Sequence, residues 1–257
     1  MYMRLIPKKI IKQLSFLNSG ANESTRKKLA LDYINFIRKN GKVTFYQPTY
    51  NPNNFKLCGT DESARKETDI RVETISNHLD FSRINSYLDI GSATGYFVFK
   101  LAESNKMIAQ GIEMDKILCS YSNAIVILND LENISFMNCR LTPELAGKLP
   151  RFDLISFLNV FHRIVHFDGF DVADRMMKIL SDKCDYFVFE TGQYNEKGYY
   201  WTEDLKFMED DPDLWVRKYM VSLGYKILHS ENFKSALSDS MRTFICCSRV
   251  SDSEVTR

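Results

Sequence analysis

Two patterns of apolar residues alternate along most of this chain. Short runs such as FDLISFL at 152–158 are apolar nearly throughout, which is typical of strands that are buried on both faces of a sheet. Between these runs, apolar positions recur every three to four residues, which predicts helices that bury one side. We expect strands at 87–90, 108–112, 134–138, 152–158, 186–189, 225–229 and 242–247, and helices at 61–79, 96–104, 116–128, 168–180 and 212–223.

This alternation predicts an α/β protein with one Rossmann-like sheet, because a helix between two strands returns the chain so that the strands run parallel. The last two strands are close in sequence, which predicts that one of them is reversed. We expect this domain to occupy residues 43–250 and residues 251–257 to form a loose tail.

Residues 1–42 form a basic helical arm in front of this domain. Apolar residues at helical spacing predict one helix that starts near Pro7 and a second that Ser24 caps. The arm carries ten Lys or Arg residues and two acidic residues, so its net charge is +8 whereas that of the remainder is −7. It can meet something anionic, such as a membrane surface, a glycan phosphate or RNA, or it can simply cover the core with a solvated basic face.

Length and composition favour a single domain with additions, because 257 residues of which 44% are hydrophobic can bury one large core. The six cysteines include no C-x-x-C pair, and no His/Cys cluster has metal-ligand spacing. We expect no signal peptide, and the sequence shows no long apolar run. We therefore expect free thiols, no metal site and a cytoplasmic location, with contact between the arm and the inner face of the membrane as a further option.

The candidate ligand site is the βαβ unit YLDIGSATGYFVFKLAESNKMIAQGIEMD at 87–115. Such units bind ligands at the carboxyl ends of their strands, where Gly91 and Gly95 allow close approach of the backbone and Glu113 can accept hydrogen bonds from two ribose hydroxyls. A dinucleotide fingerprint would need glycine at the position of Ala93, so a nucleoside without a pyrophosphate fits better. The structural alternative is a buried βα turn that needs only small residues.

Asp89, the G-S-A-T-G loop that follows it and an acidic residue about twenty positions further on resemble the S-adenosylmethionine (SAM) site of class I methyltransferases. In that family the loop lies against the amino-acid end of the cofactor, and the carboxylate after the second strand holds the ribose. The resemblance implies SAM as the cofactor and a methyl group that is presented to an acceptor. It also implies a seven-stranded sheet of order 3-2-1-4-5-7-6 whose last strand is antiparallel.

Candidate catalytic residues follow the fourth predicted strand. It runs into NVFHRIVHFDG at 159–169, which brings Asn159, His162, Arg163 and His166 to the cofactor edge. Two histidines and one arginine in five residues predict a cationic rim that can also accept protons. An alcohol acceptor would need His162 or a partner as its base, whereas a phosphate is already anionic and needs only donors that hold it. The alternative is that His162 packs under the adenine and His166 caps the next helix.

Longer segments resemble one group within this family. FHRIVHFDGFD, CDYFVFETG and YYWTEDLKFMEDDPDLW look like the methyltransferase domain of bacterial O-antigen chain-terminating kinase–methyltransferases, a similarity that spans about residues 45–248. More distantly, the layout resembles RNA 5′-phosphate-capping methyltransferases of the bicoid-interacting type. Both groups methylate a phosphate oxygen. The resemblance therefore implies an O-methyltransferase acting on a phosphate, in the O-antigen case at the end of a lipopolysaccharide chain.

The same resemblance implies which residues bind the cofactor. Tyr46 and Gln47 would close over SAM. Arg71 would bind its carboxylate, whereas helix spacing alone suggests a surface ion pair of Arg71 with Glu67 or Glu73. The remaining cofactor-binding residues implied by the match are Asp89, Gly91, Ser92, Gly95, Glu113, Met114, Asp115, Cys139, Arg140, Leu141, Asn159 and Val160. Arg140 could instead be only an exposed charge.

This chain departs from that group in two ways. These 257 residues include no segment that resembles a kinase, so we expect any phosphate to be made by a separate kinase or glycan-assembly protein, or the acceptor to be a plain hydroxyl. The tandem histidine of the group is His162-Arg163 here, which keeps the positive charge and removes one proton acceptor. The aromatic run at 199–201 could stack on a sugar or a base, but aromatics after the fifth strand more often close the core.

Three interpretations of function remain open at this point. The first is a SAM-dependent O-methyltransferase that modifies a phosphate or hydroxyl at the end of a surface polysaccharide or a related phosphorylated glycan. The second is the same fold acting on RNA, guided by the basic arm; it ranks second because the sequence has no added RNA-binding module. The third is a non-catalytic, methyltransferase-like scaffold.

Overall fold

The computed structural model describes residues 22–40, 47–53, 62–196, 198–208, 211–235 and 240–250. In these ranges seven strands form one sheet of order β3-β2-β1-β4-β5-β7-β6. The strands are β1 Ser86–Ile90, β2 Ile108–Glu113, β3 Ile134–Asn138, β4 Phe152–Leu158, β5 Cys184–Glu190, β6 Tyr225–Lys234 and β7 Met241–Arg249. β1 to β5 are parallel, and β7 runs antiparallel to both β5 and β6. The predicted order and the reversed last strand are therefore confirmed.

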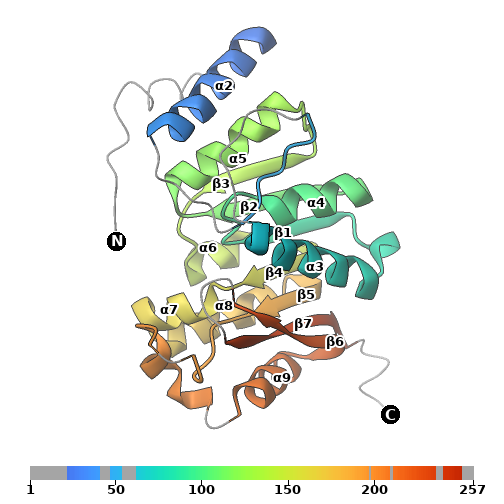
Figure 1. Ribbon diagram of the computed structural model, residues 1–257. Coiled ribbons are helices and arrows are strands. Elements are labelled where there is room, and N and C mark those ends of the chain that lie inside the picture. The colour runs from blue at the N-terminus through green and yellow to red at the C-terminus, as the bar shows by residue number, and fades with distance from the viewer. Residues whose placement is uncertain are drawn as a thin grey trace.

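Helices cover both faces of this sheet (Figure 1). One face carries α3 Glu62–His78, α4 Tyr96–Asn105 and α5 Lys116–Leu128, with α2 Glu23–Asn40 outside α5. The other face carries α6 Pro143–Lys148, α7 Phe161–Asp168, α8 Phe170–Ser181 and α9 Pro212–Ser222. Two short 3-10 helices, η1 Phe81–Arg83 and η2 Thr202–Met208, complete the described elements.

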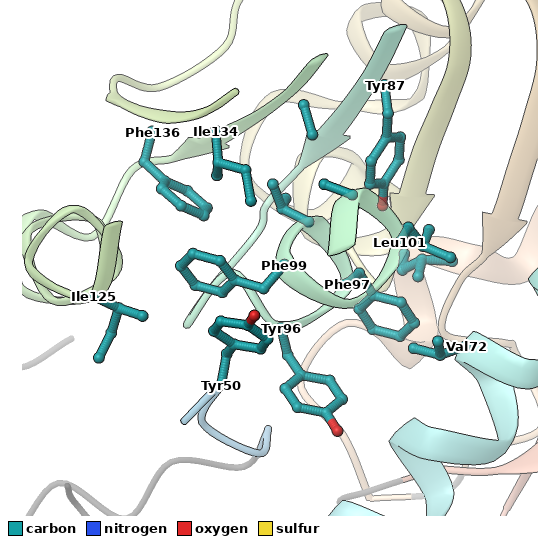
Figure 2. Close-up of a cluster of buried hydrophobic side chains, with 14 of the residues drawn as sticks. Tyr50, Val72, Tyr87, Tyr96, Phe97, Phe99, Leu101, Ile125, Ile134 and Phe136 are labelled. Atoms are coloured by element: carbon teal, nitrogen blue, oxygen red, sulfur yellow. The ribbon is translucent and has the colours of Figure 1, made fainter. Parts of the chain in front are cut away.

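Alternate side chains of the strands divide the apolar core into two layers, because successive strand residues point to opposite faces. On β1, Tyr87 joins the layer under α3, α4 and α5, whereas Leu88 and Ile90 join the layer under α6, α8 and α9. Figure 2 shows the first layer, in which Tyr50 stacks on Phe99 with ring centroids 4.8 Å apart. This stack holds the segment around Tyr50 against α4.

Two short helices differ from the sequence prediction. α6 was not predicted; Thr142 caps it by accepting a hydrogen bond from the N–H of Leu145 at 3.3 Å. α7 occupies the segment expected to form a rim, and Gly169, with φ of +89°, separates it from α8. The helix predicted over 168–180 therefore begins at Phe170. Elements of six and eight residues contain too few repeats of an apolar pattern to reveal their period.

The described part of the basic arm is α2, which lies along α5 (Figure 1). The Tyr33 hydroxyl donates to the carbonyl oxygen of Ile117 in α5 at 3.2 Å. The capping residue is Asn22 and not Ser24, since the Asn22 side chain accepts from the N–H of Thr25 at 2.9 Å. The helix predicted in front of α2 and the predicted tail lie outside the described residues. α2 thus covers the core with one face.

Candidate functional site

A loop of tight backbone turns joins β1 to α4 at the carboxyl edge of the sheet. Gly91, Ala93 and Gly95 have φ angles of +77°, +48° and +77°, a region that glycine enters without steric cost. A Cβ atom on Gly91 would lie 2.4 Å from Cγ2 of Val160. One on Gly95 would lie 2.4 Å from Cζ of Phe136. Both glycines are therefore required by the shape of the loop and by its close contacts.

Glu113 ends β2 beside this loop and is buried, with 7% of its surface exposed. Its Oε2 accepts the N–H of Ala93 at 2.8 Å, and its Oε1 accepts the N–H of Asp115 at 2.7 Å. Burial raises the pKa of Glu113, while these N–H donors act in the opposite direction. The N–H of Met114 also acts on this carboxylate. The two oxygens offer about four lone-pair positions together, so the carboxylate can still accept a further donor.

Asp89 on β1 is the second buried carboxyl group of the site. Ser156 of the adjacent β4 donates its hydroxyl to Oδ1 of Asp89 at 2.5 Å, and the Tyr87 hydroxyl lies 2.7 Å from the same serine oxygen. Burial, with a smaller contribution from the charge of Glu113, raises the pKa of Asp89 from 3.8 to about 7. Asp89 can therefore change its charge near neutral pH, and a nearby cation would favour its ionised form.

The raised pKa of Asp89 predicts how stability depends on pH. The folded chain binds the carboxyl proton of Asp89 more tightly than the unfolded chain does. The contribution of this proton to stability is therefore complete below pH 3.8 and is lost as the pH rises through about 7. We expect Asp89→Asn, which stays neutral, to gain stability relative to the wild type between about pH 5 and pH 8. Urea unfolding of both proteins at these two pH values measures the change. Asp171→Asn, at an exposed position of α8, is the control; an Asp89→Asn difference that is constant with pH would contradict the prediction.

Gln47, one residue of the predicted lid, lies against the glycine loop. The Thr94 hydroxyl donates to the carbonyl oxygen of Pro48 at 3.0 Å and lies 3.4 Å from Oε1 of Gln47. Tyr46, the other residue of the predicted lid, lies outside the described residues. Ser92 in the loop is fully buried, and its hydroxyl oxygen has no hydrogen-bond partner among the residues that the structure describes.

Three of the cofactor-binding residues implied by the resemblance follow the ends of β2 and β3, which are neighbours in the sheet. Met114 is 64% exposed, Cys139 is half-buried and Leu141 is buried. An exposed methionine beside apolar groups is suited to cover a flat ring, because its side chain is flexible and polarizable. Cys139 and the other four described cysteines are free thiols, as expected.

Asp115 and Arg140, also implied by the resemblance, already have protein partners. Asp115 caps α5, since its Oδ1 accepts the N–H groups of Ile117 and Leu118 at 2.7 and 3.2 Å. Arg140 is exposed and forms an ion pair with Asp168 at the end of α7. In this structure their side chains support α5 and α7.

Arg71 forms the ion pair with Glu67 that helix spacing suggests, with Nη1 3.6 Å from Oε2 of Glu67, but its shorter contacts are with Glu190. It is buried, and its Nε and Nη2 donate to the two carboxylate oxygens of Glu190 at 2.7 and 3.0 Å. Nη2 also donates to the carbonyl oxygen of Lys234, and Nη1 to that of Glu67, both at 3.0 Å. These bonds use four of the five N–H donors of the guanidinium group. The fifth N–H is on Nη1, which lies 3.6 Å from the Glu67 carboxylate, so Arg71 has at most this one donor left for a cofactor carboxylate.

Asn159 links this ion pair to a second buried one. Its Nδ2 donates to Glu190 at 3.3 Å, and its Oδ1 accepts from Nη1 of Arg242 at 2.5 Å. Arg242 donates from Nε and Nη2 to the two oxygens of Glu196 at 2.8 and 2.7 Å. We call Arg71, Glu190, Asn159, Arg242 and Glu196 the buried polar network. It holds Asn159 at φ of +60°, which is uncommon for a residue other than glycine, directly after β4.

His162 on α7 is turned inward and is 1% exposed. Its Nδ1 accepts the backbone N–H of Gly192 at 2.9 Å, and the Thr191 hydroxyl oxygen lies 3.3 Å from the same nitrogen. Burial, and then the charges of Arg242 and Arg163, hold the pKa of His162 well below 6.5. The expectation of a cationic ring is therefore wrong for His162, because a buried imidazole beside two arginines remains neutral.

Arg163 and His166 are less buried than His162. Arg163 is exposed, and His166 is partly buried with its Nδ1 2.6 Å from Oδ2 of Asp204 in η2. α7, which the sequence analysis missed, turns His162 into the core and leaves Arg163 exposed. The cationic rim expected at 159–169 therefore lacks the His162 ring.

An aromatic series leads from His162 to the surface. The buried Trp201 packs on His162, with ring centroids 4.7 Å apart. Tyr200 packs on Trp201 at 4.9 Å, and His166 packs on Tyr200 at 4.7 Å. Phe167 is 65% exposed and Tyr200 56%, and their centroids are 6.5 Å apart. Trp201 thus closes the core, as expected after the fifth strand. We call Phe167 and Tyr200 the exposed aromatic pair.

Sequence reasoning missed Glu190, Glu196 and Arg242. Glu190 could have been found, because it is a polar residue at the carboxyl end of a buried strand beside β4, the same signal that identified Glu113. Glu196 and Arg242 are 46 residues apart, and no local pattern pairs them.

Within the described ranges, no three or more His, Cys, Asp or Glu side chains gather so that they could hold a metal ion. No helix of the same ranges combines the length and apolar character needed to cross a membrane.

Known proteins resemble this chain over part of their length. No protein-family model matches it. Two curated proteins of Escherichia coli, each named O-antigen chain terminator bifunctional methyltransferase/kinase WbdD, are 28% identical to it over 147 residues. The match covers 55% of this chain and 20% of each relative, so the chain spans about a fifth of the length of these relatives.

Solved structures share the fold. A crystal structure of WbdD superposes with a TM-score of 0.65 at 23% identity, over 85% of this chain and 46% of that one. Magnesium protoporphyrin IX methyltransferase (ChlM) from Synechocystis PCC 6803, with bound SAM, superposes with a TM-score of 0.54 at 14% identity. This match covers 97% of this chain and 100% of that one. The [4+2]-cyclase SpnF superposes with a TM-score of 0.54 at 12% identity, over 89% of this chain and 96% of that one. The chain has the class I methyltransferase fold and resembles the methyltransferase part of WbdD. Because a cyclase shares the fold, the reaction has to be argued from the site.

Proposed function

We propose that this chain is a SAM-dependent O-methyltransferase that methylates a phosphate or hydroxyl at the end of a surface polysaccharide of the O-antigen type, or a related phosphorylated glycan. One observation carries the proposal. Glu113 ends β2 with its carboxylate oriented by the N–H groups of Ala93 and Asp115, and the carboxylate can accept a further hydrogen bond. A carboxylate at this place in an α/β sheet is suited to accept a hydrogen bond from a ribose hydroxyl.

The neighbouring groups suit the other parts of SAM. Asp89, with a pKa of about 7, can ionise beside the ammonium group of the amino-acid end. Met114, Cys139 and Leu141 offer a largely apolar surface for the adenine. Gln47 lies where it can cover the glycine loop. When bound, SAM would supply an electrophilic methyl group.

The task of the protein in such a transfer is to align the acceptor and exclude water, because the reaction is an in-line displacement on carbon. Asn159 and Val160 directly follow β4, and Val160 packs closely against Gly91 of the loop. The buried polar network holds Asn159 at both ends of its amide. We infer that Asn159 and Val160 form the wall against which the methyl group is positioned.

Three observations support a phosphorylated glycan as the acceptor. The E. coli relatives are named as O-antigen chain terminators, and they join a methyltransferase to a kinase. The exposed aromatic pair has the chemistry that stacks on the apolar face of a sugar ring. Arg163, exposed on the same helix as Phe167, can attract a phosphate. A separate kinase or glycan-assembly protein would then provide the phosphate, at the inner face of the membrane.

The exposed aromatic pair yields a prediction for substrate binding. We expect the double substitution Phe167→Ala and Tyr200→Ala to raise KM for the glycan acceptor about tenfold, because each stacking contact contributes about 0.5–1.5 kcal/mol. Affinity for S-adenosylhomocysteine should not change. Steady-state kinetics and calorimetry measure the two quantities. Leu228→Ala, which removes an exposed apolar side chain on β6, is the control. An unchanged acceptor KM would remove this surface from the acceptor site.

Calorimetry with S-adenosylhomocysteine tests the cofactor, and transfer of labelled methyl groups from SAM tests the reaction. The acceptors are sugar phosphates, the same sugars without phosphate, and 5′-phosphorylated RNA. We expect cofactor binding and transfer to sugar phosphates. Absence of cofactor binding would refute the proposal, and transfer to RNA alone would favour the nucleic-acid interpretation.

A further inference from the structure

Three polar side chains lie together on one face of the sheet, on β1 and β4. Residues two apart on a strand point to the same face, so Tyr87 and Asp89 share a face of β1. The pairing of the two strands sets Ser156 of β4 beside Asp89. Asp89 is 2% exposed, and the other two are fully buried. Tyr87 belongs to the apolar layer of Figure 2, whereas Asp89 lies next to the glycine loop, so the three side chains connect the core to the candidate cofactor site.

The hydrogen bonds among these side chains have a direction. The Ser156 hydroxyl donates its single hydrogen to Oδ1 of Asp89 at 2.5 Å. The Tyr87 hydroxyl, 2.7 Å from the same serine oxygen, must therefore donate the second bond. Burial, and then the charge of Asp89, raise the pKa of Tyr87, so the phenol keeps the hydrogen that it donates. We call Tyr87, Ser156 and Asp89 the hydroxyl relay.

The relay leaves one oxygen of Asp89 open. Oδ2 accepts no hydrogen bond from the residues that the structure describes, whereas Oδ1 is held by Ser156. The titratable groups that face Asp89 are Tyr87 of its own strand and Glu113 of β2, and β4 contributes the uncharged Ser156. The charge of Glu113 opposes a second negative charge beside it. A cationic donor at Oδ2 would supply the charge that the ionised carboxylate lacks.

We propose that Ser156 and Tyr87 are positioning residues of the cofactor site, which hold Asp89 so that Oδ2 meets the ammonium group of the cofactor, and that binding of this group releases one proton near neutral pH. The inference rests on the proposed methyl transfer, since it takes SAM as the cofactor. Fixing Oδ1 also fixes Oδ2, because a carboxyl group is planar and rigid. The proton passes from Asp89 to the solvent, since the ammonium group already carries three hydrogens and donates one of them to Oδ2.

The pH dependence of cofactor affinity tests this coupling. A protonated Asp89 offers no charge to the ammonium group, so we expect Kd for S-adenosylhomocysteine to rise about tenfold from about pH 8 to about pH 6. Calorimetry in buffers of different ionisation enthalpy should count about one proton released at pH 6 and about none at pH 8. The control ligand is 5′-methylthioadenosine, which has the adenosine but no amino-acid part. Its Kd should stay constant over this interval, and its binding should release no proton.

Single-atom substitutions assign the effect to the relay. Ser156→Ala removes the donor to the carboxylate, so the midpoint of the affinity profile should rise by about one pH unit. Tyr87→Phe should raise it by less, because Ser156 still donates to Asp89. Asp89→Asn should make Kd for S-adenosylhomocysteine independent of pH. Residues with only a structural role would change Kd by the same factor at every pH. Ser135→Ala, at an exposed position of β3, and Tyr186→Phe, at a buried position of β5, are the controls.

Carbon-13 NMR of aspartate-labelled protein tests the relay without a ligand. The spectrum of Asp89→Asn identifies the carboxyl signal of Asp89. We expect this signal to titrate at about pH 7 in the wild type, and at a higher pH in Ser156→Ala and Tyr87→Phe. Titration at about pH 4 in the wild type, or an unchanged titration in both variants, would overturn the inference whether or not the chain binds a cofactor.

The binding experiments separate the inference from the proposed function. If S-adenosylhomocysteine binds without releasing a proton at pH 6, or if 5′-methylthioadenosine shows the same pH dependence, the coupling to Asp89 is wrong and the proposed methyl transfer stands. Failure of the wild type to bind S-adenosylhomocysteine would refute the proposed methyl transfer together with the role of Asp89 toward the ammonium group. The NMR titration would still decide whether Ser156 and Tyr87 set the charge of Asp89.

Discussion

Replacing Glu113 with alanine is expected to lower the affinity for S-adenosylhomocysteine at least about 100-fold. A hydrogen bond to a charged group contributes about 1.5–3 kcal/mol, and the ribose would lose this acceptor. The substitution also removes the partner of the Ala93 and Asp115 N–H groups, so the glycine loop loses an anchor. Isothermal titration calorimetry measures the affinity.

Two further variants make this result specific to the carboxylate. Glu113→Gln keeps one oxygen but turns an NH₂ group toward a backbone N–H, so we expect an affinity between those of the wild type and Glu113→Ala. Glu132→Ala, at an exposed position before β3, should bind like the wild type. Thermal unfolding of each variant separates a lost ligand contact from a lost fold. If a folded Glu113→Ala protein bound S-adenosylhomocysteine normally, the cofactor site would have to lie elsewhere.

The sheet could be predicted because its signals are local. The segments predicted at 116–128, 134–138 and 152–158 agree with α5, β3 and β4, since each apolar pattern is long enough to define its own period. β6 extends beyond its prediction to Lys234. It is an edge strand whose second half, with Glu231 and Asn232 exposed, has no continuous apolar run. Edge strands therefore escape a rule that detects buried ones.

In the candidate site, too, contacts between residues close in sequence could be predicted, and contacts between distant residues could not. Glu113 and the glycine loop belong to one βαβ unit, and their proximity follows from the order of residues along the chain. The charge of His162 depends on Arg242, which comes from the far end of the sequence. Arg71 likewise finds its partner 119 residues away, in Glu190. A local pattern shows which charges are present but not how they are paired. This is why His162 was expected to be cationic and is neutral.

Replacing Arg242 with methionine is expected to lower the free energy of unfolding by about 3–5 kcal/mol, because it leaves a buried carboxylate without its counter-ion. Arg242 and Glu196 have side chains that are 5% and 0% exposed, and two N–H donors of the arginine meet the two oxygens of the glutamate. In the variant, Glu196 would keep the backbone N–H of Gln193 at 2.7 Å. Asn159 would lose the donor to its Oδ1. Urea unfolding measures the loss, and a decrease in Tm of about 6–20 °C should accompany it.

The same substitution at an exposed ion pair provides the matched control. Arg140 pairs with Asp168, but the arginine side chain is 56% exposed, so Arg140→Met should cost no more than about 1 kcal/mol. The double variant Arg242→Met with Glu196→Leu should be more stable than Arg242→Met alone, because it removes the unpaired charge and fills the space with apolar atoms. Equal losses for Arg140→Met and Arg242→Met would mean that the buried polar network does not hold this edge of the sheet. A large loss at Arg242 alone would mean that the ion pair beside His162 also secures Asn159, so the stability of the fold and the position of the acceptor wall would share one set of contacts.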